Sequence, residues 1–114
     1  MVPVLERDLI NNIVARPQSW RGRSGRLYAL LPLRLADFVL VPDRLYVVAL
    51  GAHVLWVGGA EDLVQDASSR ARFRLALDCA DRAYAVETVA DEVERLTVVW
   101  DLEGGKPAAG LSAA

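Results

Sequence analysis

The sequence predicts a small α+β domain in which helices pack on a mostly antiparallel sheet, and two observations carry this prediction. Residues 27–58 hold only four charged side chains, which is typical of strands buried in a core. Segments 3–15 and 68–80 instead repeat apolar residues at helical spacing. The 114 residues suffice for one hydrophobic core, so we expect a single domain over residues 1–105.

The N-terminal helix is predicted over residues 3–15. Pro3 suits the first turn of a helix, and apolar residues then recur every four positions from Leu5. A proline at position 17 disfavours helical geometry at the residue before it and therefore ends the helix. Glycine and polar residues over 17–25 predict a loop that leads into the sheet.

Four strands are predicted next. Residues 26–31 and 35–41 are mostly apolar and are predicted as two strands, and we expect a turn between them at Pro32, because proline lacks the N–H that a central ladder needs. Residues 45–50 and 53–58 form the clearest hairpin, since the two residues between them begin with glycine. The expected result is a meandering antiparallel sheet.

A second helix is predicted over about 68–80, with Asp66 or Ser68 as its N-terminal cap. Phe73 and Leu77 are four residues apart and would lie on the face that packs against the sheet.

The C-terminal region is harder to assign. Residues 84–87 indicate a short edge strand. Segment 97–102 is rich in β-branched residues and favours a strand, although the composition from residue 91 onward also allows a helix. Residues 106–114 follow two glycines and are small, so we expect a tail that is flexible or ordered by a partner.

The composition favours a cytoplasmic protein with no membrane segment. The longest uncharged run covers residues 45–60, which is too short to span a bilayer, and the N-terminus lacks the pattern of a secretion signal. Cys79 is the only cysteine and is expected to be a buried hydrophobe in a reducing compartment. Twelve of the thirteen basic residues are Arg, which we attribute to G- and C-rich coding in a bacterium or phage.

Charge is divided along the chain. Residues 16–34 carry five Arg and no acid, whereas residues 78–103 carry eight acids and two Arg. Such a division either steers partners of complementary charge, favours head-to-tail self-association, or reflects ordinary solvated faces. The candidate binding residues are Trp20, Arg21, Arg23 and Arg26 on the basic side, and Asp91, Glu92 and Glu94 on the acidic side.

The three tryptophans are expected to differ in exposure. Trp56 and Trp100 lie within apolar runs and are predicted to be core residues, whereas Trp20 has polar and cationic neighbours and is predicted to be exposed. Trp and Arg together suit stacking on bases and binding of phosphate, but a net charge of −2 disfavours nucleic acid as the partner. The acidic half suits a basic groove on a protein instead.

Residues 54–63, with Tyr46 upstream, resemble the paired strands of GIY-YIG nucleases over about 19 residues. The resemblance implies that Tyr46 matches the first motif tyrosine, that Trp56 replaces the second, and that Gly58 matches the motif glycine. The family has an arginine where this chain has Asp66, which puts a negative charge where a scissile phosphate needs a positive one.

Binding without catalysis is the predicted function. We assign no catalytic residue, metal or cofactor, because His53 has no partner for acid–base chemistry at a recognisable spacing. We expect a small accessory protein that acts as an inhibitor or adaptor of a larger protein assembly. The alternatives are a structural subunit of a homo-oligomer or virion, and a divergent or degenerate GIY-YIG-like nuclease.

Overall fold

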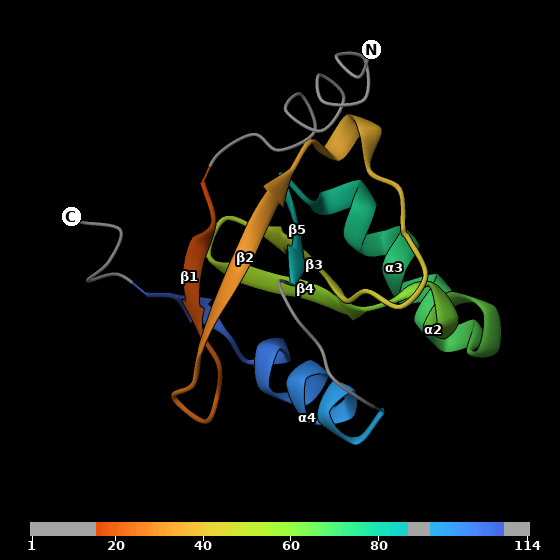
Figure 1. Cartoon of the computed structure of the whole chain (residues 1–114). Coiled ribbons are helices and arrows are strands. Elements are labelled where there is room, and N and C mark those ends of the chain that lie inside the picture. The colour runs from red at the N-terminus through yellow and green to blue at the C-terminus, as the bar shows by residue number, and fades with distance from the viewer. Residues whose placement is uncertain (1–15, 87–91, 109–114) are drawn as a thin grey trace, which may run out of the picture.

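The fold is a curled antiparallel sheet with helices on both of its faces (Figure 1). The computed structural model describes residues 16–86 and 92–108. Within them the sheet has six strands in the order β4-β3-β5-β2-β1-β6. The strands are β1 (Gln18–Arg21), β2 (Leu27–Leu33), β3 (Tyr46–Leu50), β4 (His53–Gly58), β5 (Arg82–Val86) and β6 (Lys106–Pro107). The helices are the 3-10 turn η1 (Leu35–Asp37), α2 (Ala60–Gln65), α3 (Ala67–Cys79) and α4 (Glu92–Glu103).

The α+β class, the antiparallel pairing, the 45–58 hairpin and the second helix are confirmed. β3 and β4 pair directly across the turn that begins at Gly51, whose φ of 58° suits glycine. The side chain of Asp66 accepts a hydrogen bond from the amide of Ser68 and caps α3. The predicted N-terminal helix, residues 3–15, lies outside the described residues.

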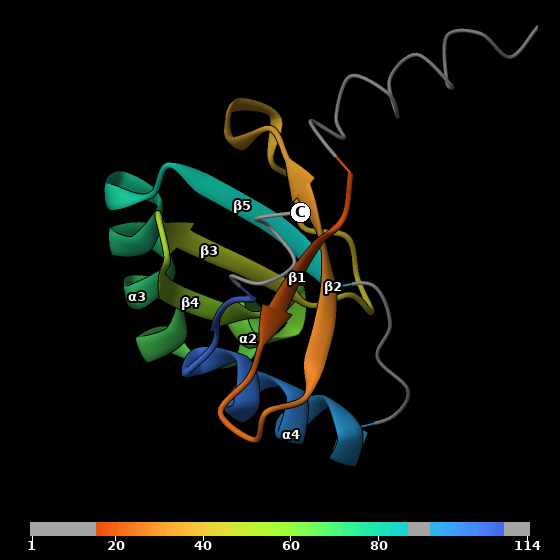
Figure 2. The ribbon, with the colours of Figure 1, turned by 90° about the vertical axis from the view of Figure 1, so that its left-hand side faces the viewer.

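The two faces of the sheet are both buried, which explains the scarcity of charge in residues 27–58. In β3, Val47 belongs to the core under α4, whereas Tyr46 and Val48 belong to the core under α3. Figure 2 shows the sheet between these helices. A strand that is buried on both faces has no polar side, so the alternation that usually marks a strand is lost.

The predicted meander is wrong, because β5 is inserted between the two hairpins. β5 pairs with β2 on one side and with β3 on the other. The strand predicted at 84–87 as an edge is therefore central. Its residues from Ala83 to Val86 are all buried, and a short apolar segment of this kind gives no local signal of its place in the sheet.

The prediction of a turn between two strands at Pro32 is also wrong. Pro32 lies inside β2, opposite Tyr84 of β5. The ladder with β1 ends at Leu30, so β2 has one described neighbour at this point, and a proline is tolerated there. The predicted strand over 35–41 is absent, and η1 stands at its start.

The segment predicted as a loop over 17–25 contains a strand. β1 pairs with β2 and, on its other side, with β6. The sheet thus extends into the range predicted as a tail, because Lys106 and Pro107 pair with β1 and Ala108 N donates to Ser19 O at 2.9 Å. Residues 109–114 lie outside the described part of the chain.

The segment 97–102, for which a strand was favoured, is helical and forms the second half of α4. Val98 and Leu102 are one helical turn apart, and both are fully buried against the sheet. Packing of this face overrides the strand preference of the β-branched residues. In the part of the chain that the structure describes, no helix is long and apolar enough to cross a membrane.

Candidate protein-interaction face

The loop between β1 and β2 folds onto the C-terminal half of α4, and together they form the candidate site. The loop is a tight reversal in which Gly22 N donates to Arg26 O at 2.8 Å and Gly25 N donates to Gly22 O at 3.0 Å. Gly25 has a φ of 93°, which a side chain would strain. The amide of Arg23 donates to Asp101 O at 3.0 Å and ties this loop to the helix.

Asp101 organises the contact between the loop and α4. Its buried carboxylate accepts hydrogen bonds of 2.7 Å from the Ser24 amide, the Ser24 hydroxyl and the Tyr28 hydroxyl. Burial favours the neutral acid, but these hydrogen bonds outweigh burial and hold the pKa of Asp101 below its usual value. The carboxylate is therefore a fixed anion that positions the loop.

The same hydrogen bond shifts the pKa of Tyr28 upward, whereas it lowers the pKa of Asp101. Burial and the hydrogen bond to the Asp101 carboxylate raise the pKa of Tyr28 to about 12. The guanidinium of Arg26 lies 4.8 Å from the centre of the Tyr28 ring, and its Nη1 pairs with Glu94 Oε1 at 3.2 Å. Arg26 and Glu94, predicted from opposite halves of the chain, thus neutralise each other within the molecule.

Arg23 and Trp100 meet at the surface. The guanidinium of Arg23 lies 5.1 Å from the centre of the indole ring, and its Nε donates to the Trp100 carbonyl at 2.9 Å. This arrangement is a cation–π contact held in place by a backbone hydrogen bond. It presents an aromatic ring with a cation stacked over it at the surface.

The outer side of α4 carries an apolar stripe. Val93, Leu96 and Trp100 are exposed to 76%, 61% and 53%. At 100° per residue these three positions fall on one stripe of the helix, opposite the stripe that Val98 and Leu102 bury. We call Val93, Leu96, Trp100 and Arg23 the α4 face. A surface helix usually has a polar outer face, so this stripe is an exception that packing among the described residues does not explain.

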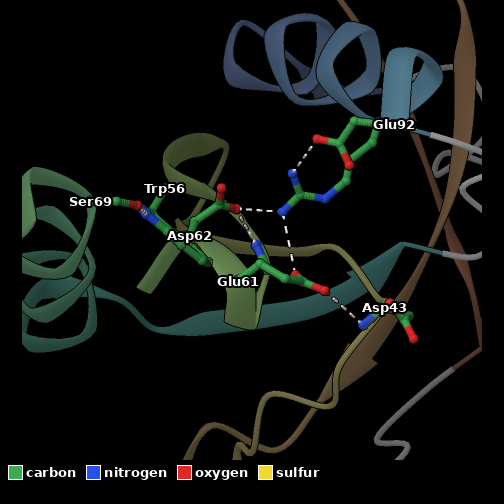
Figure 3. Close-up of polar contacts among 8 residues, drawn as sticks. Asp43, Trp56, Glu61, Asp62, Ser69 and Glu92 are labelled. Carbon is green, nitrogen blue, oxygen red and sulfur yellow. Dashed lines mark hydrogen bonds and ion pairs between the residues drawn. The ribbon is translucent and has the colours of Figure 1, made fainter. Parts of the chain in front are cut away.

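A network of charges fixes the other flank of α4. Arg95 Nη2 lies 2.7 Å from Asp62 Oδ2 and 3.5 Å from Glu61 Oε1, and Figure 3 shows both acids turned toward this one guanidinium. Asp62 also accepts from Gly59 N at 2.7 Å, and Glu61 Oε2 accepts from Asp43 N at 3.2 Å. These contacts join α4 to the start of α2 and hold the helix rigid beneath its apolar face.

The structure corrects two predictions about the tryptophans. Trp20 is fully buried, with its ring 5.4 Å from that of Tyr84 in an edge-on contact, so the expected exposure of Trp20 is wrong. Trp100, predicted as core, is half exposed. Trp56 is buried as predicted. In β1, Trp20 lies between the partly buried Ser19 and the exposed Arg21, and a strand of four residues is too short for its buried position to be predicted from sequence.

The remaining candidate residues are placed as follows. Arg21 is exposed, and its Nη1 donates to Gly25 O within the loop at 3.1 Å. Glu92 stands at the start of α4 with a side chain that is 76% exposed, 3.8 Å from Arg95. Asp91 lies outside the described residues. Cys79 is exposed, which corrects its predicted burial.

Sequence reasoning missed Trp100, Asp101 and Arg95. A signal for Arg95 did exist, because it shares the spacing of Val98 and Leu102 and must therefore face inward with them. No comparable local signal marks Asp101, since its partners are 73 and 77 residues away.

The residues of the GIY-YIG resemblance have packing partners in this fold. The Tyr46 hydroxyl accepts a hydrogen bond from Val41 N at 2.9 Å, and Tyr46 is buried. Trp56 Nε1 donates to Ser69 Oγ at 3.2 Å between β4 and α3 (Figure 3). Among the described residues no three His, Cys, Asp or Glu side chains are grouped in a way that could hold a metal ion.

Comparison of this chain with known protein families, with characterised proteins and with solved structures finds no match.

Proposed function

We propose that this chain is a non-catalytic protein-binding module that docks on a larger assembly through the α4 face and acts there as an inhibitor or adaptor. The exposure of Val93, Leu96 and Trp100 on one stripe of a well-packed helix carries this proposal. Contiguous apolar surface of this kind is typical of interaction sites.

The chemistry of the α4 face suits a binding hot spot. Trp and Arg are enriched among the residues that dominate interface energies, because each buries a large area or several polar contacts with few rotatable bonds. Arg23 and Trp100 are already held against each other, so binding would order little that is not ordered in the free protein.

The rigidity beneath the face supports the same function. Asp101 fixes the loop that carries Arg23, and Arg95 fixes the helix that carries the stripe. A preorganised surface pays less entropy on association than a mobile one.

The test is affinity capture with the full chain from the lysate of its native host, with and without nuclease treatment, read by quantitative mass spectrometry. Leu96→Asp and Trp100→Ala alter the α4 face. Leu75→Asp is the matched control, because Leu75 is 65% exposed on α3.

The proposal predicts a stoichiometric protein partner that survives nuclease treatment, is lost with both α4 variants and is kept by the Leu75 variant. Equal capture by all variants would contradict it. Recovery of this chain alone would favour the homo-oligomer, and partners that disappear on nuclease treatment would favour nucleic acid.

A further inference from the structure

We propose that the open edge of β4 is a second binding site, which takes up a short extended segment of a protein partner as an additional strand of the sheet. This edge is separate from the α4 face, and binding there does not depend on that face. The partner segment that fits carries an acidic and a basic residue at adjacent positions.

β4 has one ladder. It is the outermost strand of the sheet order, and within residues 16–86 and 92–108 it pairs with β3 alone. No hydrogen bond among the described residues reaches its outer edge. An edge strand directs the N–H and C=O of alternate residues away from the sheet, so these groups are available to another strand.

The sequence of β4 does little to protect this edge. The strand reads His-Val-Leu-Trp-Val-Gly and contains neither a lysine nor a proline, which natural proteins often place on open edges. The pairing of β4 with β3 has one bulge. Val48 pairs with Trp56 and Ala49 pairs with Val54, so Leu55 has no partner residue in β3. A bulge bends the strand, so it limits the straight edge and fits a short partner segment.

A groove runs along this edge between two helices. Its floor is Val54–Val57, one wall is Ser69 and Arg72 of α3, and the other wall is Glu103 of α4. The groove holds about 250 Å³, below the usual size of a small-molecule pocket. Figure 2 shows β4 with α3 and α4 near it.

Two opposite charges flank the groove. Arg72 and Glu103 are both exposed, and neither forms an ion pair or hydrogen bond within the described part of the chain. They lie on opposite faces of the sheet. Because successive side chains of a strand point to opposite faces, adjacent acidic and basic residues of an added strand would reach Arg72 and Glu103 respectively.

Charge also argues against an antiparallel second copy as the occupant. A twofold axis perpendicular to the sheet, which pairs the two β4 strands antiparallel, keeps each face on its own side, so α3 would meet α3 and Arg72 would approach Arg72. Like charges facing each other oppose such a contact. A partner strand with the complementary pair has no such cost.

The test uses the full chain and an array of synthetic octapeptides with a Val- and Thr-rich frame. The two central residues are Glu-Lys in the probe and Lys-Lys or Glu-Glu in the charge controls. A third set of peptides keeps the Glu-Lys pair but is N-methylated at alternate backbone amides. Binding is measured by fluorescence anisotropy, and its location by amide exchange and NMR shifts of Val54–Val57.

We expect the Glu-Lys probe to bind and to protect β4 amides, and the N-methylated probe to lose binding. Arg72→Glu should weaken the probe about tenfold, because repulsion replaces attraction, and should restore affinity for Lys-Lys. Arg74→Glu is the matched control, since Arg74 is exposed on the same helix but does not line the groove.

Several outcomes would overturn the inference. They are no binding of any peptide, equal effects of the Arg72 and Arg74 variants, indifference to the charge of the central pair, and shifts confined to residues outside β4. A dimer of the free chain that protects the amides of Val54–Val57 from exchange would assign the edge to a second copy instead. The variants that alter the α4 face, Leu96→Asp and Trp100→Ala, should leave peptide binding and the protection of the β4 amides unchanged.

Discussion

The hydroxyl of Tyr28 donates a 2.7 Å hydrogen bond to Asp101 Oδ2, although 73 positions separate the two residues in the chain. Through this bond a strand of the central sheet and the last turn of α4 share one buried polar centre. The same carboxylate holds Ser24, so the loop that carries Arg23 is positioned by the core rather than by surface contacts.

Removal of the Tyr28 hydroxyl should destabilise the fold more than removal of a hydroxyl bonded to a neutral group. Tyr28→Phe leaves a buried carboxylate short of one donor and should cost about 1.5–3 kcal/mol. Tyr46→Phe is the matched control, because the buried Tyr46 hydroxyl accepts a hydrogen bond from the neutral backbone amide of Val41 at 2.9 Å, and its loss should cost about 0.5–1.5 kcal/mol. Urea denaturation measures both, and equal losses would show that the charge of Asp101 contributes nothing.

The stability that Tyr28 contributes should be lost in alkali. Its pKa is raised in the folded protein to about 12, above the value near 10 of an unfolded chain, so its contribution is complete below pH 10 and falls as the pH rises toward 12. The difference in unfolding free energy between the wild type and Tyr28→Phe should therefore shrink by about 1 kcal/mol from pH 9 to pH 11. A difference that stays constant would mean that the folded and unfolded pKa values of Tyr28 are equal.

The parts of this fold that sequence could predict are those decided by neighbours in the chain. The β3–β4 hairpin follows from its glycine turn, and α3 follows from its cap and the spacing of Phe73 and Leu77. The central place of β5 depends on pairing with strands about 50 and 35 residues earlier, and no local pattern encodes such pairing.

The candidate site divides in the same way. Arg23 and Arg26 could be singled out because a cluster of arginines is visible in any window. Their partners could not, since the contacts with Trp100 and Glu94 exist only after α4 packs on the β1–β2 loop. Part of the charge that separates the two halves of the chain is neutralised in the folded protein by the ion pair between Arg26 and Glu94.

The tryptophans provide a direct test of which ring belongs to the core. Trp20→Ala removes a fully buried ring and should cost about 3–5 kcal/mol, whereas Trp100→Ala removes a half-exposed ring and a cation–π contact and should cost less than about 1 kcal/mol. Denaturation followed by far-UV circular dichroism avoids dependence on the fluorophore. Trp20→Phe, with a smaller expected loss, serves if the alanine variant does not fold. The reverse order of the two losses would contradict the placement of both side chains.

A glycine should be required at position 22 because the Asp101 side chain leaves no room for a Cβ, and not because of the backbone conformation of residue 22. A Cβ at position 22 would collide with the Asp101 carboxylate, whose hydrogen bonds prevent it from moving aside. Gly22→Ala should therefore cost about 1–3 kcal/mol in the wild type and much less when Asp101 is already alanine.

Gly25→Ala is the control for this coupling. Nothing lies within 4 Å of the Cβ it would add, but its φ of 93° strains any side chain, so its cost should be the same with and without the Asp101 carboxylate. A double-mutant cycle by urea denaturation separates the two cases. If Gly22→Ala cost as much in the Asp101→Ala background as in the wild type, the close approach of the loop to α4 would not be what limits residue 22.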